Sequence, residues 1–310
     1  MKEHQAREYI FEEKVKKLLQ DNNYISIVED EVPGRSGYHD IHAYGKLNIS
    51  SAFSYPTRIV CQYKYYAKNR VELMHIRDFG GIMADISERN YAVKGDVGNI
   101  SDRFQYAGCF FSATAFTREA QEYAWAHDIF MISLERIEVM QPILKKIDSF
   151  VAGLSENIIN NITKEELIEG YHREVDENEL IPEAVIGIVN GVYPIMLLGK
   201  SGWTRPVFEE AKNSEIGRAY IDNVYRNENQ FEANFQLGFM ESSAEFSIPV
   251  SIIEKLMERS DNKTKENVIF NIEIPYLTEK GKKEFVSLEV FMEGFNKGDY
   301  TNKQVSFFDL

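Results

Sequence analysis

The sequence contains little cysteine and no long apolar run, and each shortage excludes a class of protein. Two cysteines, Cys61 and Cys109, are too few for a secreted disulfide scaffold. Each lies in an apolar run that predicts a buried strand, so we expect free thiols in a reducing compartment. No apolar stretch approaches the roughly 20 residues that a membrane span needs, and the charged first residues lack the pattern of a secretory signal. We therefore expect a cytoplasmic protein with no membrane segment.

An excess of basic residues is also missing. The formal net charge of the 310 residues is −14, and most of it comes from residues 151–310, whereas residues 1–150 are nearly neutral. A protein that binds nucleic acid usually presents positive charge on its contact face. The second half is therefore a poor candidate for wrapping DNA, although the first half can still carry a basic groove. The length suggests two domains.

Residues 1–150 alternate between helical and β-type hydrophobic patterns. The predicted elements are a helix over 5–20, strands over 24–28, 38–45 and 57–66, a helix over 71–86, a strand over 107–114, a helix from the N-cap Thr117 to 127, a strand over 129–133 and a helix over 134–149. The final strand, helix and strand predict a parallel crossover. We expect an α/β domain with a mixed sheet flanked by helices.

A charged run over 172–179 indicates a boundary, so residues 151–182 are expected to form a helical, charged linker. Residues 183–310 are expected to form a β-rich α+β domain. Its predicted elements are a hairpin over 185–198, an alternating strand over 231–239, a short helix from Ser251, and a hairpin from 268–277 and 284–293. Target recognition, partner docking and regulatory sensing all remain open for this half.

Polar residues interrupt the apolar strand over 57–66. Gln62 and Lys64 point to the same face, because alternate residues of a strand do so. If the strand over 38–45 pairs beside it, Asp40 converges on the same place. A carboxylate, an amide oxygen and a main-chain carbonyl suit Mg²⁺, and a nearby ammonium can counter charge on a phosphoryl oxygen. Metal-assisted phosphodiester hydrolysis needs groups of this kind, although an ordinary polar pair on a strand is the competing interpretation.

Four ordered segments carry a resemblance to a known family. They are FEEKVKKLLQDNNY, GYHDIHAYG, TRIVCQYKYYAKNRV and CFFSATAFTREAQEYAWAHDIFMISLE. Over residues 5–138 the chain resembles the Mrr-like branch of the PD-(D/E)xK restriction endonucleases. The resemblance implies a restriction-endonuclease-like fold in which Lys64 positions the attacking water. It also implies Mg²⁺, or Mn²⁺ in its place, held by Glu12, Asp40, Gln62 and the carbonyl of Tyr63. One departure is that Gly37 lies three residues before Asp40 rather than two.

Three basic residues near the predicted site are candidates for contacting phosphates. Arg35 precedes the Asp40 strand, and Lys68 and Arg70 follow the Lys64 strand. Solvated loop charge is the alternative, because basic loop residues rarely imply contact on their own. At the other end of the chain, residues 304–310 (QVSFFDL) are similar to the short peptide with which bacterial proteins dock on the DNA sliding clamp. A terminal strand packed on its own domain is the alternative there.

The favoured interpretation is a Mg²⁺-dependent endodeoxyribonuclease in restriction or antiviral defence, with DNA as its partner. A catalytically silent scaffold of the same fold, which binds a partner or ligand, is the alternative from another class, because Gln62 stands where a carboxylate would bind metal more strongly. An RNA-directed nuclease is a third possibility. We also expect that the chain can form a homo-oligomer, and that its acidic second half can restrain the first.

Overall fold

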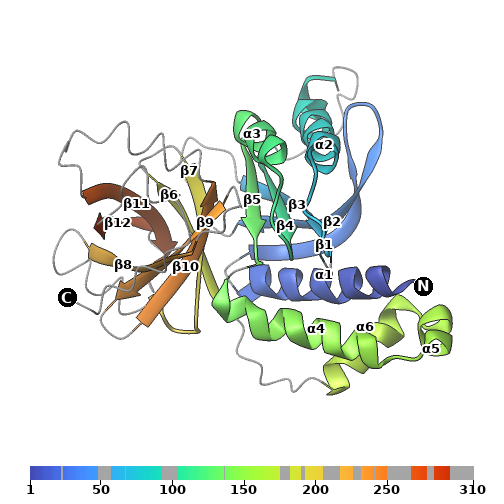
Figure 1. Cartoon of the computed structure of the whole chain (residues 1–310). Coiled ribbons are helices and arrows are strands. Elements are labelled where there is room, and N and C mark those ends of the chain that lie inside the picture. The colour runs from blue at the N-terminus through green and yellow to red at the C-terminus, as the bar shows by residue number, and fades with distance from the viewer. Residues whose placement is uncertain are drawn as a thin grey trace. The chain divides into compact units, whose positions relative to one another are not determined.

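The computed structural model describes most of the chain, and it divides into two compact units (Figure 1). The described residues are 1–21, 24–47, 57–66, 68–92, 104–135, 137–174, 182–189, 193–204, 217–225, 232–239, 242–249, 267–277 and 283–293. The first unit contains Met1–Glu135 and Pro142–Glu179, and the second contains Arg136–Gln141 and Leu180–Leu310. The division in the second half of the chain falls at the end of the charged run over 172–179.

The first unit is built on a five-stranded sheet whose strands follow one another in chain order. They are β1 (Tyr24–Pro33), β2 (Tyr38–Leu47), β3 (Thr57–Lys64), β4 (Gln105–Ser112) and β5 (Ile129–Ser133). The pairs β1–β2 and β2–β3 are antiparallel, whereas β3–β4 and β4–β5 are parallel. The predicted mixed sheet and parallel crossover are confirmed.

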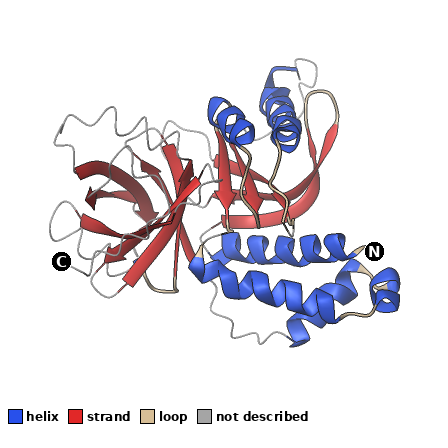
Figure 2. Cartoon of the chain, in the orientation of Figure 1, coloured by secondary structure: helices blue, strands red, loops and turns tan. Residues whose placement is uncertain are grey.

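Helices cover both faces of this sheet (Figure 2). The helices of this unit are α1 (Glu3–Asp21), α2 (Leu73–Ala92), α3 (Arg118–Ala126), α4 (Gln141–Gly153), α5 (Glu156–Asn161) and α6 (Lys164–Glu174). A short 3-10 turn, η1 (Glu138–Met140), belongs to the second unit. Each parallel connection carries one of the helices α2 and α3, and these two helices cover the same face (Figure 1). Thr117 caps α3 as predicted, by accepting a hydrogen bond from the Ala120 main-chain nitrogen.

Two apolar layers hold the helices on the sheet. Beneath α2 and α3, the buried cluster includes Ile41, Val60, Ile76, Phe79, Phe110, Phe116, Ala120 and Ala124. On the opposite face, Phe11 of α1 is fully buried, and its ring lies edge-on to those of Tyr63 and Tyr65, with centroids 6.4 and 5.5 Å away. The two faces can therefore be told apart by which helix a strand residue contacts.

Residues 151–179 are not the linker that the sequence suggested, because α5, α6 and most of α4 belong to the first unit. A capping box lies before α6: the Thr163 nitrogen donates to the Glu166 carboxylate (3.0 Å), and the Glu166 nitrogen donates to the Thr163 hydroxyl (3.2 Å). It starts a helix whose Leu167 and Tyr171, four positions apart, are buried together. The ring of Tyr171 packs edge-on against Phe150 of α4 at 5.3 Å. Charged residues surround the few apolar positions of this helix, so the sequence did not show that it packs on the first unit.

The second unit is a closed barrel of seven strands. They are β6 (Glu183–Val189), β7 (Tyr193–Gly199), β8 (Gly217–Tyr225), β9 (Glu232–Phe239), β10 (Ser242–Pro249), β11 (Asn267–Leu277) and β12 (Lys283–Glu293). Both predicted hairpins, β6–β7 and β11–β12, are confirmed. Of the pairs, β12–β8 is parallel and the others are antiparallel. The predicted helix from Ser251 and the terminal peptide 304–310 lie outside the described residues.

Cys61 and Cys109 are buried, free thiols, as predicted. They are register partners on the parallel strands β3 and β4. Burial, reinforced by the hydrogen bond with Cys109, raises the pKa of the Cys61 thiol well above its ordinary value. Over the part of the chain that the structure describes, no helix combines the length and the apolar character needed to cross a membrane.

Candidate functional site

The start of β2 lies beside the end of β3, because the two strands are antiparallel. This brings Gln62 next to Asp40: the Gln62 amide nitrogen donates a hydrogen bond to the main-chain oxygen of Asp40 at 3.4 Å. The bond occupies the nitrogen of the amide and leaves its oxygen as the atom that can bind a further partner. The Asp40 side chain is exposed. Two of the predicted residues are therefore neighbours.

If the β2–β3 pairing continued without interruption, it would also place Asp40 opposite Lys64. The described pairing ends at Ala43 and Cys61, and regular continuation from there pairs position 40 with position 64. Residues directly opposite in an antiparallel pair point to the same face. The sequence prediction that Asp40 and Lys64 converge depends on this regular register.

The register of β2 is not regular. Between one pair, Tyr44 with Val28, and the next, Ile41 with Asp30, β2 advances three residues while β1 advances two. An extra residue of this kind reverses the face to which the following side chains point. Ile41 accordingly lies in the core beneath α2 and α3.

The same shift decides where Asp40 points. His39 contacts Asp85 of α2, so both neighbours of Asp40, His39 and Ile41, face the α2–α3 side. Strand alternation then directs the carboxylate of Asp40 toward the face that carries α1.

Gln62 alternates the other way. Tyr63, the next residue, is buried against Phe11 of α1, so strand alternation starts the Gln62 side chain toward the α2–α3 face. Lys64 is the last residue of β3, and its ammonium reaches Glu8 of α1 instead. Within the described part of the chain, no hydrogen bond or ion pair joins the Asp40 carboxylate to the side chain of Gln62 or Lys64. The three predicted groups share one end of the sheet without touching through their side chains.

Lys64, the last residue of β3, forms an ion pair with Glu8 of α1, a residue that the sequence motif did not include. Its ammonium donates to the Glu8 carboxylate at 2.9 Å, and the two side chains are 28% and 21% exposed. Glu8 lies one helical turn before Glu12, so the acidic spacing of four on α1 was the available signal. Glu8, rather than Glu12, brings a carboxylate of α1 to the Lys64 ammonium.

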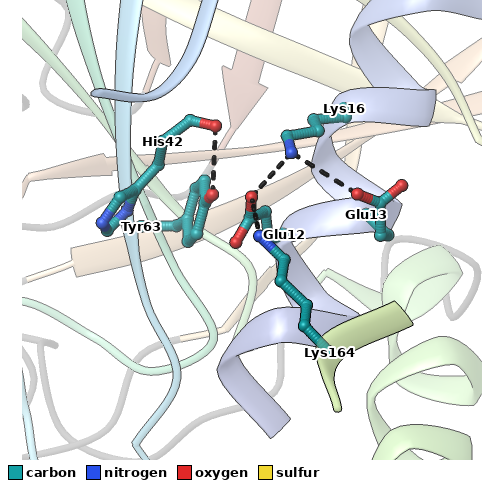
Figure 3. A network of polar contacts seen from close by, with 6 residues as sticks. All are labelled: Glu12, Glu13, Lys16, His42, Tyr63 and Lys164. Carbon is teal, nitrogen blue, oxygen red and sulfur yellow. Dashed lines mark hydrogen bonds and ion pairs between the residues drawn. The ribbon is translucent and has the colours of Figure 1, made fainter. Parts of the chain in front are cut away.

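Glu12 has a different role in the structure. It is 2% exposed, and its carboxylate accepts hydrogen bonds from the ammonium of Lys16 at 2.6 Å and that of Lys164 at 3.1 Å. Lys16 also reaches Glu13 at 3.4 Å. Figure 3 shows the Glu12 carboxylate between one lysine from its own helix and one from α6. Glu12 therefore has its charge compensated by two ammonium groups and joins α1 to α6.

Tyr63 offers a metal only its main chain. Its side chain is 1% exposed, and its hydroxyl donates to the main-chain oxygen of His42 at 3.2 Å. The ring lies on that of His42, with centroids 4.3 Å apart (Figure 3). The main-chain carbonyl that the resemblance assigns to the metal remains the candidate atom.

A turn just before Asp40 is fixed to α2 by Asp85. Its carboxylate accepts hydrogen bonds from the Ser36 nitrogen (3.0 Å), the Ser36 hydroxyl (2.8 Å) and His39 (2.7 Å). The hydrogen bond from His39, and then those from Ser36, lower the pKa of Asp85. A Cβ on Gly34 would lie 2.0 Å from a carboxylate oxygen of Asp85, so this close approach needs glycine. His39 is thus directed to Asp85.

The basic candidates lie on either side of the site. Arg35 is exposed in the turn fixed by Asp85, Lys68 is exposed after β3, and Arg70 is half-buried. Tyr66, also just past β3, shares a 2.8 Å hydrogen bond with the His75 ring. Burial raises the pKa of Tyr66, the charge of Lys64 lowers it, and Glu8 raises it. Tyr66 is therefore an electrostatic neighbour of the Lys64–Glu8 pair that no sequence motif indicated.

The donor set suits Mg²⁺ in part. The Asp40 carboxylate, the Gln62 amide oxygen and the Tyr63 carbonyl are hard oxygen ligands, whereas Glu12 does not fit because two lysines already compensate its charge. For one ion to bind both Asp40 and Gln62, the exposed Asp40 side chain must turn toward Gln62. Among the described residues, no three His, Cys, Asp or Glu side chains gather into a metal-binding group. The candidate ligands differ from such a group because they include an amide and a main-chain carbonyl.

Comparison with known proteins adds little to this geometry. No protein-family model and no curated protein matches the chain. One solved crystal structure, of a protein of unknown function, is 14% identical and is matched over 53% of this chain and 95% of its own, with a TM-score of 0.30. A likeness at that level supports no argument about fold or activity.

Proposed function

We propose that the first unit is a Mg²⁺-dependent endonuclease that hydrolyses phosphodiester bonds of DNA in restriction or antiviral defence. The observation that carries the proposal is the partly buried Lys64–Glu8 pair at the end of β3. It lies at the same end of the sheet as Asp40 and Gln62. An acid, an amide and an ammonium there are the groups that phosphodiester hydrolysis assisted by a metal requires.

Each residue has a distinct role in this proposal. Asp40, Gln62 and the carbonyl of Tyr63 would hold Mg²⁺, for which Mn²⁺ can substitute. The bound ion supplies Lewis-acid polarisation of the phosphate and a lowered pKa of bound water. Glu8 keeps the Lys64 ammonium in one position. From there Lys64 donates a hydrogen bond to the attacking water or to a phosphoryl oxygen as negative charge develops.

Cleavage of plasmid DNA by the whole protein with Mg²⁺ tests the proposal. We expect Asp40→Ala and Lys64→Ala each to lower the rate by roughly a hundredfold or more, the usual effect of removing a group that stabilises developing charge. Lys17→Ala, which removes an exposed lysine of α1, is the matched control and should cleave like the parent. If the Asp40 and Lys64 variants also cleave like the parent, the assignment is wrong. An RNA of the same sequence tests the RNA-directed alternative.

A catalytically silent scaffold that binds a partner is the second candidate, and two observations favour it. The register shift in β2 turns Asp40 away from the face of Gln62, and the buried carboxylate of Glu12 is already compensated by lysine. Both weaken divalent binding. Isothermal calorimetry separates the two functions: a scaffold gives no heat of binding with Mg²⁺ or Mn²⁺ and no cleavage.

We propose an accessory role for the second unit. Its acidic barrel is suited to partner docking, target recognition or restraint of the first unit rather than to broad phosphate binding. Homo-oligomer formation and docking on a sliding clamp through 304–310 are further partner proposals. A fragment that tests restraint must end near residue 179 rather than 150, because the first unit continues through α6.

A further inference from the structure

Tyr38 is the most exposed large apolar side chain of the described chain, at 72%. It is the first residue of β2 and precedes Asp40 by two positions. The other exposed large apolar side chains, which are Met74, Ile158 and Ile188, lie on other elements. A single exposed aromatic residue is common at protein surfaces. Its exposure alone therefore indicates no function, and the residues around it have to be considered.

The turn that presents Tyr38 is fixed at several points. The Arg35 nitrogen donates to the main-chain oxygen of Asp85 at 3.0 Å, and the Gly34 nitrogen donates to the Gly37 oxygen at 2.6 Å. These bonds add to the three that the Asp85 carboxylate accepts from Ser36 and His39. The backbone that carries the Tyr38 ring is therefore already ordered, which lowers the conformational cost of binding a partner.

A charged residue of the same turn indicates which kind of partner Tyr38 would bind. Arg35, three residues before it in the same turn, is also exposed. An aromatic face next to a cation is the combination with which proteins bind single-stranded nucleic acid, through stacking of a base and pairing with a phosphate. Bases within a duplex are already stacked, so they present only their edges to a protein.

We propose that Tyr38 is a stacking platform for an unpaired base of DNA, with Arg35 holding the adjacent phosphate. The inference rests on the proposed nuclease function and narrows its substrate to DNA that has a single-stranded stretch, a flap or an extruded base near the Asp40 end of the sheet. The fixed turn sets the distance between the stacked base and the candidate metal ligands.

Fluorescence anisotropy of the full chain with a labelled single-stranded oligonucleotide tests this proposal in EDTA, where metal-dependent cleavage is absent. Tyr38→Ala should weaken binding by roughly fivefold to a hundredfold, the range that base stacking on one aromatic provides. Tyr38→Trp should bind at least as well as the parent. Met74→Ala removes another exposed apolar side chain, 60% exposed, and should leave binding unchanged. The fully paired duplex should be insensitive to Tyr38→Ala.

The outcomes separate this inference from the nuclease proposal. Equal affinity of the parent and Tyr38→Ala for the single strand, or no binding by the parent, overturns the inference even if plasmid cleavage is found. Loss of affinity in Tyr38→Ala without any cleavage supports stacking and rejects the nuclease. If Tyr38→Ala weakens binding of the single strand and of the duplex equally, the stacking inference is also wrong. If the protein binds an RNA strand more tightly than DNA and Tyr38→Ala removes that preference, RNA rather than DNA is the partner.

Discussion

Replacing Glu12 by alanine should destabilise the first unit much more than replacing the adjacent Glu13. Glu12 is almost fully buried and accepts hydrogen bonds from Lys16 and Lys164. Removing its carboxylate takes an ion pair away from each of two ammonium groups, on side chains that are only 12% and 22% exposed. Glu13 touches the same Lys16 from a more open position, 33% exposed and 3.4 Å away.

The magnitude follows from burial. Removing one partner of a buried ion pair costs about 3 to 5 kcal/mol, and the partial exposure of the two lysines places Glu12→Ala near about 3 kcal/mol. For a unit of this size, that lowers Tm by roughly 6 to 12 °C. Glu13→Ala removes the longer and more open of the two contacts to Lys16, and such a pair contributes only about 0.2 to 1 kcal/mol.

Urea unfolding measures the loss of stability, and hydrogen exchange of the α1 and α6 amides shows that the loss occurs in the first unit. The double variant Glu12→Leu with Lys164→Met should recover at least half of the loss, because it removes buried charges of both signs. The reasoning is refuted if Glu12→Ala unfolds at the same urea concentration as Glu13→Ala. If Glu12→Ala keeps full stability but abolishes DNA cleavage, Glu12 is at the metal and the ion-pair interpretation fails.

Two further predictions concern the turn and the barrel. Gly34→Ala should displace the turn from α2, because the new Cβ would lie 2.0 Å from Asp85; loss of exchange protection at the Ser36 amide measures this, and unchanged protection contradicts it. In the second unit, Glu245 accepts a hydrogen bond from the Glu138 main chain, and burial raises its pKa to about 7. The folded barrel therefore keeps a proton that the unfolded chain loses near 4.5, so barrel stability should fall as pH rises from about 4.5 to 7 and then level off. Glu245→Gln should remove this fall in urea midpoints measured by a probe in the barrel; an identical pH profile refutes the assignment.

Patterns of short range were readable from the sequence alone. The spacing of apolar residues located the helix of Phe11, the strand of Val60 and the strands on either side of α3. The Thr117 cap and the Thr163–Glu166 capping box act within four residues, so sequence identifies them directly. The mixed sheet followed as well, because a strand, helix and strand in succession connect almost always by a right-handed parallel crossover.

Contacts between distant segments were not readable in this way. Lys164 reaches Glu12 across 152 positions, and Lys64 reaches Glu8 across 56. Nothing local identifies the partner of either lysine, because both partners lie far away in the sequence. The closure of the barrel likewise depends on the parallel pair β12–β8, which joins segments that no turn connects.

The sequence by itself determined which residues near Asp40 and Lys64 carry polar chemistry and on which strands they lie. The tertiary structure decided whether they meet, because one extra residue in β2 reverses the face of Asp40. Side-chain direction in a strand has a period of two, so a single unpaired residue changes the outcome, and its presence depends on the partner strand.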